Sequence, residues 1–265
     1  MNGSLDDERV RNLLGYLDDV GFHDLYVRPT PFSASAPRAP ESITAGATKT
    51  NEPSHLATVG ATVGSVTVGA PSAGDLDLPS AAAALDEIAV RVASCTRCRL
   101  CEGRNKTVFG SGDPRARLMF IGEGPGAEED RQGLPFVGRA GELLTKIIQA
   151  IELSREQVYI ANIVKCRPPG NRDPQPDEVV ACRSYLERQI EIVRPRVLVA
   201  LGRIAAQTLL GNEDPIGRMR GRWVNVFGVP TMVTYHPAAL LRNPALKRPT
   251  WEDMQEVRNR LREIE

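Results

Sequence analysis

Apolar residues along this 265-residue chain follow two alternating patterns from about residue 117 onward. Short apolar runs, typical of buried strands, are followed by segments in which apolar residues recur every three or four positions, as in amphipathic helices. The strands predicted in this way are 117–121, 158–164, 197–201, 223–227 and 230–234, and the helices are 138–151, 176–193, 204–210 and 251–264. Strands that alternate with helices predict a mostly parallel sheet sandwiched by helices.

The pattern is weaker toward the N-terminus. Residues 1–27 are predicted to contain a short amphipathic helix, because Val10, Leu13, Leu14 and Leu17 fall on one helical face. Residues 28–79 are rich in Ala, Ser, Thr, Gly and Pro without periodicity, which predicts a disordered linker. Ser80 is a suitable N-cap for a helix that runs to about residue 93. Residues 80–265 are therefore expected to form the folded domain.

The formal net charge of zero hides an asymmetry. Residues 1–94 carry 6 Lys and Arg against 12 Asp and Glu, whereas residues 95–265 carry 27 against 21. A basic folded part gives mild support for a polyanionic partner. The first ten residues are polar and acidic, unlike a signal peptide, and no apolar run approaches the length of a membrane span, so we expect a cytoplasmic protein.

Four cysteines have the spacing of metal ligands. Cys95 and Cys98 form a C-x2-C pair, and Cys166 and Cys182 form a C-x15-C pair. A structural zinc site usually has two tight pairs, whereas iron–sulfur clusters accept four thiolates at wide and irregular spacings. This spacing therefore favours a [4Fe–4S] cluster over zinc. In a reducing compartment, metal binding also suits these cysteines better than disulfide formation.

Two readings of the cysteines compete with this one. Cys101 forms a second C-x2-C pair with Cys98, so spacing alone leaves the ligand set ambiguous. Cys182 also lies on an apolar helical stripe, as a buried cysteine without a ligand role would. Polar and basic neighbours surround Cys95 and Cys98, which makes ordinary core positions a poor explanation for that pair.

Polar and glycine-rich segments stand at the ends of three predicted strands. They are 122–126 (Gly-Glu-Gly-Pro-Gly), 159–162 (Tyr-Ile-Ala-Asn) and 234–237 (Thr-Tyr-His-Pro). The carboxyl ends of parallel strands are where ligands bind in open α/β sheets. The first segment also fits a G-x-G-x-x-A dinucleotide pattern, but the acidic residues 128–130 would repel a pyrophosphate, so nucleotide binding there is disfavoured.

The first of these segments, together with 134–141 (Leu-Pro-Phe-Val-Gly-Arg-Ala-Gly), 162–169 (Asn-Ile-Val-Lys-Cys-Arg-Pro-Pro) and 236–238 (His-Pro-Ala), resembles the motifs of the family-4 uracil-DNA glycosylases. The resemblance covers about residues 94–265. It implies a three-layer αβα sandwich around a short, mostly parallel four-stranded sheet, behind a disordered N-terminal extension. It also implies a [4Fe–4S] cluster held by Cys95, Cys98, Cys166 and Cys182, with Cys101 as a bystander.

The resemblance implies roles for the residues around a flipped-out uracil. Phe136 would stack on the base, Asn162 would read its edge, and His236 would hydrogen-bond uracil O2 as charge develops on the departing base. Glu129 matches a family carboxylate near the site. An ordinary core phenylalanine, a turn asparagine and a structural histidine are the alternatives for the first three residues.

The group that orients the water is less evident. The best-known uracil-DNA glycosylases have an Asp before the proline of the first segment, and family 4 has an Ala, whereas this chain has Gly124. The resemblance places Gly124 with Phe136, Asn162 and Glu129 among the uracil-binding residues. Glu123 could orient the water, and we predict it to be catalytic beside His236. The cleavage would be dissociative and would need little base strength.

DNA is expected to bind through Arg167, Arg172, Leu241 and Arg242, with an apolar wedge at 240–241 unless these leucines are core residues. The N-terminal extension could recruit a replication or repair protein, and we expect a monomer. Two other functions are alternatives: an iron–sulfur protein that binds uracil-DNA without turnover, and an electron-transfer or radical protein. The sequence after Pro169 lacks the histidine of glycosylase relatives that trap the sugar, and a C-x3-C-x2-C radical motif is absent.

Overall fold

The computed structural model describes residues 78–264. The predicted N-terminal helix and nearly all of the predicted linker therefore lie outside the described residues. The first described element is helix α2 (Leu78–Ala93), which ends where the sequence predicts but begins two residues before Ser80. Ser80 as an N-cap is therefore wrong: Pro79 is compatible with the first turn of a helix, so the helix begins ahead of it.

The centre of the fold is one sheet in the order β1-β3-β2-β4-β6-β5. Its strands are β1 (Ser111–Gly112), β2 (Leu118–Gly122), β3 (Tyr159–Asn162), β4 (Val197–Leu201), β5 (Trp223–Val226) and β6 (Val229–Thr234). The four inner strands are parallel, and β1 and β5 pair antiparallel at the two edges. The α/β fold is confirmed, but the prediction of four strands is wrong, since the sheet has six. The two-residue β1 has no hydrophobic pattern by which it could be found.

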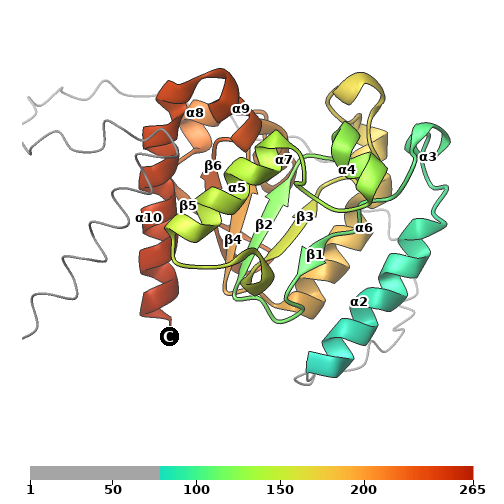
Figure 1. Ribbon diagram of the computed structural model, residues 1–265, viewed down its shortest axis with the longest axis horizontal. Coiled ribbons are helices and arrows are strands. Elements are labelled where there is room, and N and C mark those ends of the chain that lie inside the picture. The colour runs from blue at the N-terminus through green and yellow to red at the C-terminus, as the bar shows by residue number, and fades with distance from the viewer. Residues whose placement is uncertain (1–77, 265) are drawn as a thin grey trace, which may run out of the picture. The chain divides into compact units, whose positions relative to one another are not determined.

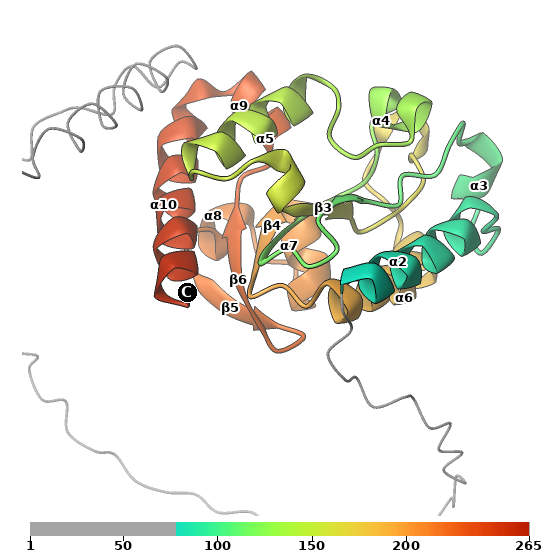
Figure 2. The same cartoon turned by 60° about the horizontal axis from the view of Figure 1, so that its bottom comes forward.

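Helices cover both faces of this sheet (Figure 1). On one face, α2, α6 (Pro176–Val193), α7 (Arg203–Leu210) and α8 (Ile216–Met219) pack on side chains such as Met119 and Leu198. On the other face, α5 (Arg139–Ala150), α9 (Pro237–Arg242) and α10 (Lys247–Glu263) pack on their strand neighbours, such as Leu118 and Val199. Alternate strand residues thus serve two separate apolar layers. In Figures 1 and 2, α2 lies alongside α6.

Short elements connect these layers, and some boundaries differ from the prediction. Helix α3 (Leu100–Gly103) follows the first cysteines, α4 (Ala127–Gln132) follows β2, and one-turn 3-10 helices occur at Arg155–Gln157, Pro169–Asn171 and Pro244–Leu246. Strand β3 ends at Asn162 rather than at residue 164, and α10 begins four residues before residue 251 because Pro249 fits in its first turn. Of the helices described, none combines the length and apolar character that crossing a bilayer requires.

Candidate active site at the carboxyl ends of the strands

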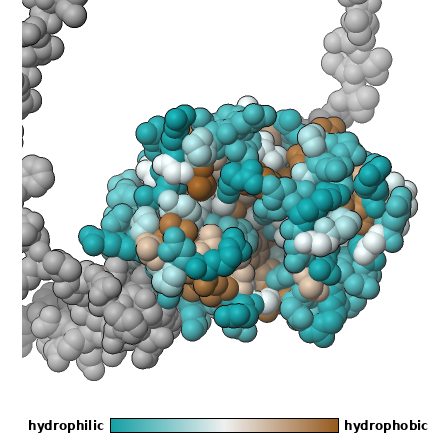
Figure 3. All heavy atoms as spheres, turned by 90° about the horizontal axis from the view of Figure 1, so that it is seen from above, coloured by the Kyte–Doolittle hydropathy of each residue, from teal (hydrophilic) through white to brown (hydrophobic). Residues whose placement is uncertain are grey.

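A large open cavity with a volume of about 500 Å³ lies where the parallel strands end. Figure 3 looks down on the molecule from above and shows a hollow with apolar and near-neutral residues inside a largely hydrophilic rim. The cavity brings together residues from the ends of all four parallel strands. Its lining includes the predicted residues Glu123, Gly124, Glu129, Phe136, Asn162, Arg172, His236 and Arg242.

Asn162, the last residue of β3, is buried on the floor of this cavity. Its amide oxygen Oδ1 is buried and accepts no hydrogen bond within the described part of the chain. The neighbouring residue of β2 is Gly122, and a Cβ atom there would lie 2.6 Å from Cζ of Phe136 and closer still to Oδ1 of Asn162. Glycine at 122 therefore lets the amide and the aromatic ring meet above the sheet. A buried acceptor without a partner is costly unless a ligand supplies the donor.

Phe136 is only 6% exposed and adopts a positive φ of 52°, which is uncommon for a residue with a side chain. The start of α5 packs against its backbone, because a Cβ atom on Gly141 would collide with the carbonyl of Phe136. Position 141 therefore needs glycine for this close packing. A strained conformation that its surroundings hold in place is frequent at binding sites.

Glu129 holds the Phe136 loop in position. Its carboxylate accepts hydrogen bonds from the backbone N–H groups of Val137 (3.0 Å), Gly138 (3.1 Å) and Gly126 (3.1 Å). Arg155 contacts the same loop by donating to the carbonyl oxygen of Pro135. Glu129 lines the cavity as predicted, but both of its oxygens accept from backbone groups, which indicates that it organises the loop.

His236 follows β6 and N-caps α9. Its Nδ1 accepts a hydrogen bond from the backbone N–H of Ala238 at 3.1 Å, so the proton of the neutral ring resides on Nε2. Burial, reinforced by the positive charge of Arg242, lowers the pKa of His236 to about 4. At neutral pH the residue therefore presents an uncharged ring with an Nε2–H donor.

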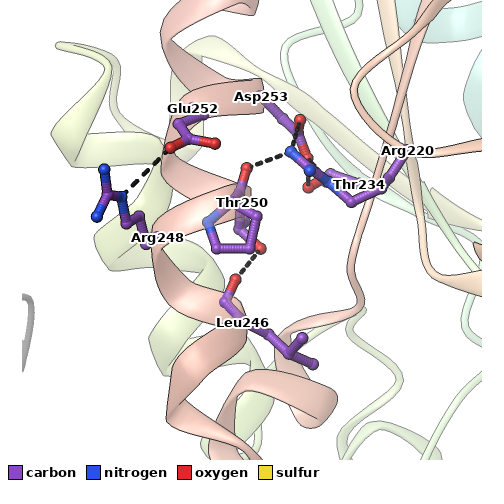
Figure 4. Close-up of polar contacts among 8 residues, drawn as sticks. Arg220, Thr234, Leu246, Arg248, Thr250, Glu252 and Asp253 are labelled. Carbon is purple, nitrogen blue, oxygen red and sulfur yellow. Dashed lines mark hydrogen bonds and ion pairs between the residues drawn. The ribbon is translucent and has the colours of Figure 1, made fainter. Parts of the chain in front are cut away.

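A polar network beneath β6 supports this strand end (Figure 4). The buried carboxylate of Asp253, on α10, accepts from the hydroxyl of Thr234 at 2.6 Å and pairs with Arg220. The Arg220 guanidinium also lies over the ring of Tyr235, 5.7 Å from its centroid. These contacts fix Thr234 and Tyr235, the two residues that precede His236. Sequence reasoning missed this network, because its partners are far apart in the chain.

Glu123 lies beside a charged pair that the sequence did not reveal. Burial and the nearby carboxylate of Asp173 raise the pKa of Glu123 to about 7, while Arg203 opposes the shift. Asp173 and Arg203 form an ion pair at 2.5 Å, and both line the cavity. Arg203 follows the end of β4, so the rule that located the other three strand ends could have found it.

Gly124 offers no side chain to the cavity and has little room for one. A Cβ atom at this position would lie 2.8 Å from Cγ2 of Val164. Glycine at 124 is thus matched to the packing of the segment after β3.

The five cysteines lie around a second, smaller pocket. Its lining includes Cys95, Cys98, Cys101, Cys166 and Cys182, so the structure does not separate Cys101 from the other four. Burial raises the pKa of Cys166 to about 11, and Arg104 opposes this by donating to its sulfur at 3.2 Å. Among residues 78–264, no three cysteine, histidine or acidic side chains converge closely enough to hold a single metal ion.

The predicted DNA-binding residues differ in their exposure and in their hydrogen-bond partners. Arg172 forms two hydrogen bonds, of 2.8 and 2.6 Å, with the fully buried carboxylate of Glu178, so its guanidinium ties the loop to α6. Arg167 bonds Asn171 at 2.8 Å, and Arg242 is exposed at the cavity rim. In the predicted wedge, Leu240 is completely buried, which makes it a core residue, whereas Leu241 is 40% exposed.

Comparison with known proteins agrees with this geometry. The family model described as the uracil DNA glycosylase superfamily matches residues 109–257. A type-4 uracil-DNA glycosylase of Saccharolobus solfataricus is 47% identical over 67% of this chain and 86% of its own length. One of Thermotoga maritima is 44% identical over 66% and 93%, and a type-5 uracil-DNA glycosylase of Pyrobaculum aerophilum is 33% identical over 66% and 91%.

The matched residues contain the entire parallel sheet and the large cavity at its strand ends. The chain belongs to the uracil-DNA glycosylase superfamily and, within it, to the type-4 family. The resemblance drawn from the sequence motifs is thereby confirmed.

Proposed function

We propose that this protein excises uracil from DNA by hydrolysing the N-glycosidic bond, which leaves an abasic site. The observation that carries this proposal is the buried amide oxygen of Asn162, which has no partner among the described residues and lies in a cavity with the ring of Phe136 and with His236. Its family membership supports the same activity. Uracil supplies the N3–H donor that Oδ1 of Asn162 lacks, and its flat ring can stack on Phe136.

Recognition of the base rests on Phe136 and Asn162. The flipped base stacks on the Phe136 ring, a contact worth about 1–3 kcal/mol. The Asn162 Oδ1 accepts from uracil N3–H while its NH₂ group donates to O4. Cytosine has an acceptor at N3 and a donor at position 4, so both contacts would be mismatched, at a cost of about 1–3 kcal/mol each.

His236 stabilises the departing base. Its Nε2–H donates to uracil O2, where negative charge accumulates as the glycosidic bond breaks. A neutral ring suits this role. It keeps its proton, and the hydrogen bond from Nε2–H becomes stronger as negative charge develops on uracil O2. The backbone N–H of Ala238 and the network around Asp253 keep the ring oriented.

Glu123 orients the attacking water. In its ionised form the carboxylate accepts a proton from water as the nucleophile adds to the sugar cation. The pair formed by Asp173 and Arg203 lies on the same side of the cavity and tunes the proton affinity of Glu123.

We infer that the cysteine pocket holds a [4Fe–4S] cluster through Cys95, Cys98, Cys166 and Cys182. The five cysteine side chains line one pocket, and the wide, irregular sequence spacing of these four suits a cluster better than a structural zinc site. When bound, the cluster ties the segment after α2 to α6. Lys165 connects the two sites, since its buried amine donates to the carbonyl of Asn162 at 2.8 Å and its side chain also lines the cysteine pocket.

DNA contacts are proposed for Arg167 and Arg242 through phosphate groups and for Leu241 as an apolar wedge. Arg172 contributes less directly, because its guanidinium is engaged by Glu178. We expect the protein to act as a cytoplasmic monomer. The segment before residue 78 is proposed as a site for a replication or repair partner.

The test is incubation of iron-replete protein with a uracil-containing oligonucleotide, followed by analysis on a denaturing gel. Release of free uracil and an alkali-labile strand is the expected result. Intact, alkali-resistant uracil-DNA that is shifted by the protein on a native gel would instead favour binding without turnover, and a covalent adduct on the denaturing gel would indicate trapping of the sugar.

A further inference from the structure

A second open cavity, with a volume of about 380 Å³, lies at the opposite end of the sheet from the uracil cavity. Leu118, the first residue of β2, lines it, whereas Gly124, just past the end of β2, lines the uracil cavity. At about 3.3 Å per residue, strand β2 alone separates the two by roughly 13 Å. Neither the motifs nor the proposed reaction uses this second cavity.

Guanidinium groups dominate the polar part of its lining. Four arginines and two carboxylates, Asp113 and Glu152, line it, for a formal charge of +2. Glu152 already pairs with Arg262 at 2.7 Å, and Asp113 accepts from the backbone N–H of Arg115 at 2.8 Å. Among the described residues, neither Arg115 nor Arg258 has a carboxylate within ion-pair distance.

Two of these arginines carry buried N–H groups without an acceptor. In the part of the chain that the structure describes, three buried side-chain atoms have no hydrogen-bond partner: Oδ1 of Asn162, Nη1 of Arg115 and Nε of Arg258. The first belongs to the proposed uracil cavity, and the other two belong to residues that line this second cavity. Buried donors without acceptors are rare in folded proteins and indicate a missing water or ion. Water could accept these hydrogen bonds but would leave the guanidinium charges of Arg115 and Arg258 without an anion.

We propose that this cavity binds a phosphate group, and that Arg115 and Arg258 are its principal ligands. A guanidinium fork matches the oxygens of a phosphate, and two forks can satisfy a doubly charged anion. Apolar residues such as Ile151, Leu153 and Leu261 also line the cavity. A phosphate monoester with an uncharged organic body, such as a mononucleotide, therefore fits the cavity better than inorganic phosphate does.

Binding would join two elements that are distant in the chain. Arg115 precedes β2 and Arg258 belongs to α10, where Arg117 already donates to the carbonyl of Leu261 at 2.6 Å. A bound phosphate would add a second link between these segments. Slower amide hydrogen exchange around residues 113–117 and 257–262 is the expected signature.

The test titrates dGMP and inorganic phosphate into the full-length, iron-replete protein at constant ionic strength, with calorimetry as the readout. Saturable binding is expected, tighter for dGMP, and at least tenfold weaker in Arg115→Gln and in Arg258→Gln. The matched control is Arg183→Gln on α6, whose exposed side chain pairs only with Glu187 among the described residues. It should bind like the parent protein.

Three results would overturn the proposal: no saturable binding by the parent protein, full binding by the Arg115→Gln/Arg258→Gln double variant, or equal loss in the control. Circular dichroism shows whether each variant is folded. If a variant is not, the hydrogen-exchange comparison on the parent protein decides, and a lack of phosphate-dependent protection in both segments would contradict the site. Excision of uracil is not needed for any of these readouts, so the outcome is independent of the proposed function.

Discussion

The rings of Phe136 and His236 lie with their centroids 5.5 Å apart and their planes tilted by 33°. The two residues come from separate segments of the chain: Phe136 lies in the loop before α5, and His236 follows the end of β6. Glu129 and Gly141 hold the first, and the backbone of Ala238 holds the second. A planar base that stacks on Phe136 would thus have its edge within reach of the imidazole.

Replacement of Asn162 should abolish recognition of the base edge by hydrogen bonds. We expect Asn162→Ala to slow uracil excision by about 10- to 100-fold, because the stacked base loses its edge contacts, and to remove discrimination against cytosine. Single-turnover excision from matched uracil and cytosine oligonucleotides measures both effects. Asn259→Ala is the control, since Asn259 is exposed on α10 and does not line the cavity, and an equal loss there would contradict the assignment.

The excision rate should depend on the ionisation of Glu123. Because the carboxylate form orients water and the pKa is raised to about 7, the rate should rise with pH through about 7 and then level off. We expect Glu123→Gln to be slower at pH 8, by on the order of tenfold or more, and to lose this dependence. Glu128→Gln, at an exposed carboxylate that pairs with Arg131, should keep the parent profile. A parent profile that is flat from pH 6 to 8 would refute the role.

His236 should stay neutral well below pH 6.5. Nitrogen NMR at pH 7 should report the Nε2–H tautomer, and the ring should titrate near pH 4. The folded-state pKa is below that of the unfolded chain, so the unfolded state takes up the proton first and stability should fall as pH drops from about 6.5 to 4. His236→Gln should slow excision by about 100- to 1000-fold. A protonated imidazole at pH 7 would contradict the proposed donor.

Addition of a single methyl group at Gly124 should destabilise the fold. The new Cβ of Gly124→Ala would lie 2.8 Å from Cγ2 of Val164, and overpacking of this kind costs about 1–3 kcal/mol. The double variant with Val164→Ala should recover part of that loss in denaturant unfolding. Gly217→Ala, in α8 with no atom near the added Cβ, is the matched control. Equal costs at the two glycines would disprove the packing argument.

The cysteines should separate into ligands and a bystander. Cys182→Ala is expected to lose iron and to unfold, whereas Cys101→Ala should keep both iron and fold. Iron analysis and the visible absorption spectrum of anaerobically purified protein measure the cluster, and circular dichroism measures the fold. Because Cys101 lines the same pocket, loss of iron in Cys101→Ala alone would assign it as a ligand in place of one of the four.

Much of this architecture follows from the sequence pattern. Helix α6 and strand β4 have the predicted bounds, and the segments that hold Glu123, Asn162 and His236 do meet at one edge of the sheet. Buried parallel strands are continuous apolar runs, and their carboxyl ends converge because of the topology. Both features are local or follow from general rules.

The remainder depends on contacts between distant residues. The pairing of Arg172 with Glu178, the pair formed by Asp173 and Arg203, and the backbone bonds of Glu129 all require the folded chain. Helix α9 is a further example. Leu240 is buried where α9 packs on α5, whereas the adjacent Leu241 is exposed, and the sequence alone does not distinguish the two leucines. No sequence motif that we identified marks the cavity lined by Arg115 and Arg258.

The most direct test of the account is a crystal structure of the protein with uracil, the released product, bound. We predict that uracil will lie on Phe136, with N3–H donating to Oδ1 of Asn162 and with O2 accepting from Nε2 of His236. Uracil bound elsewhere, or in this cavity with Oδ1 of Asn162 still lacking a donor, would contradict the central claim.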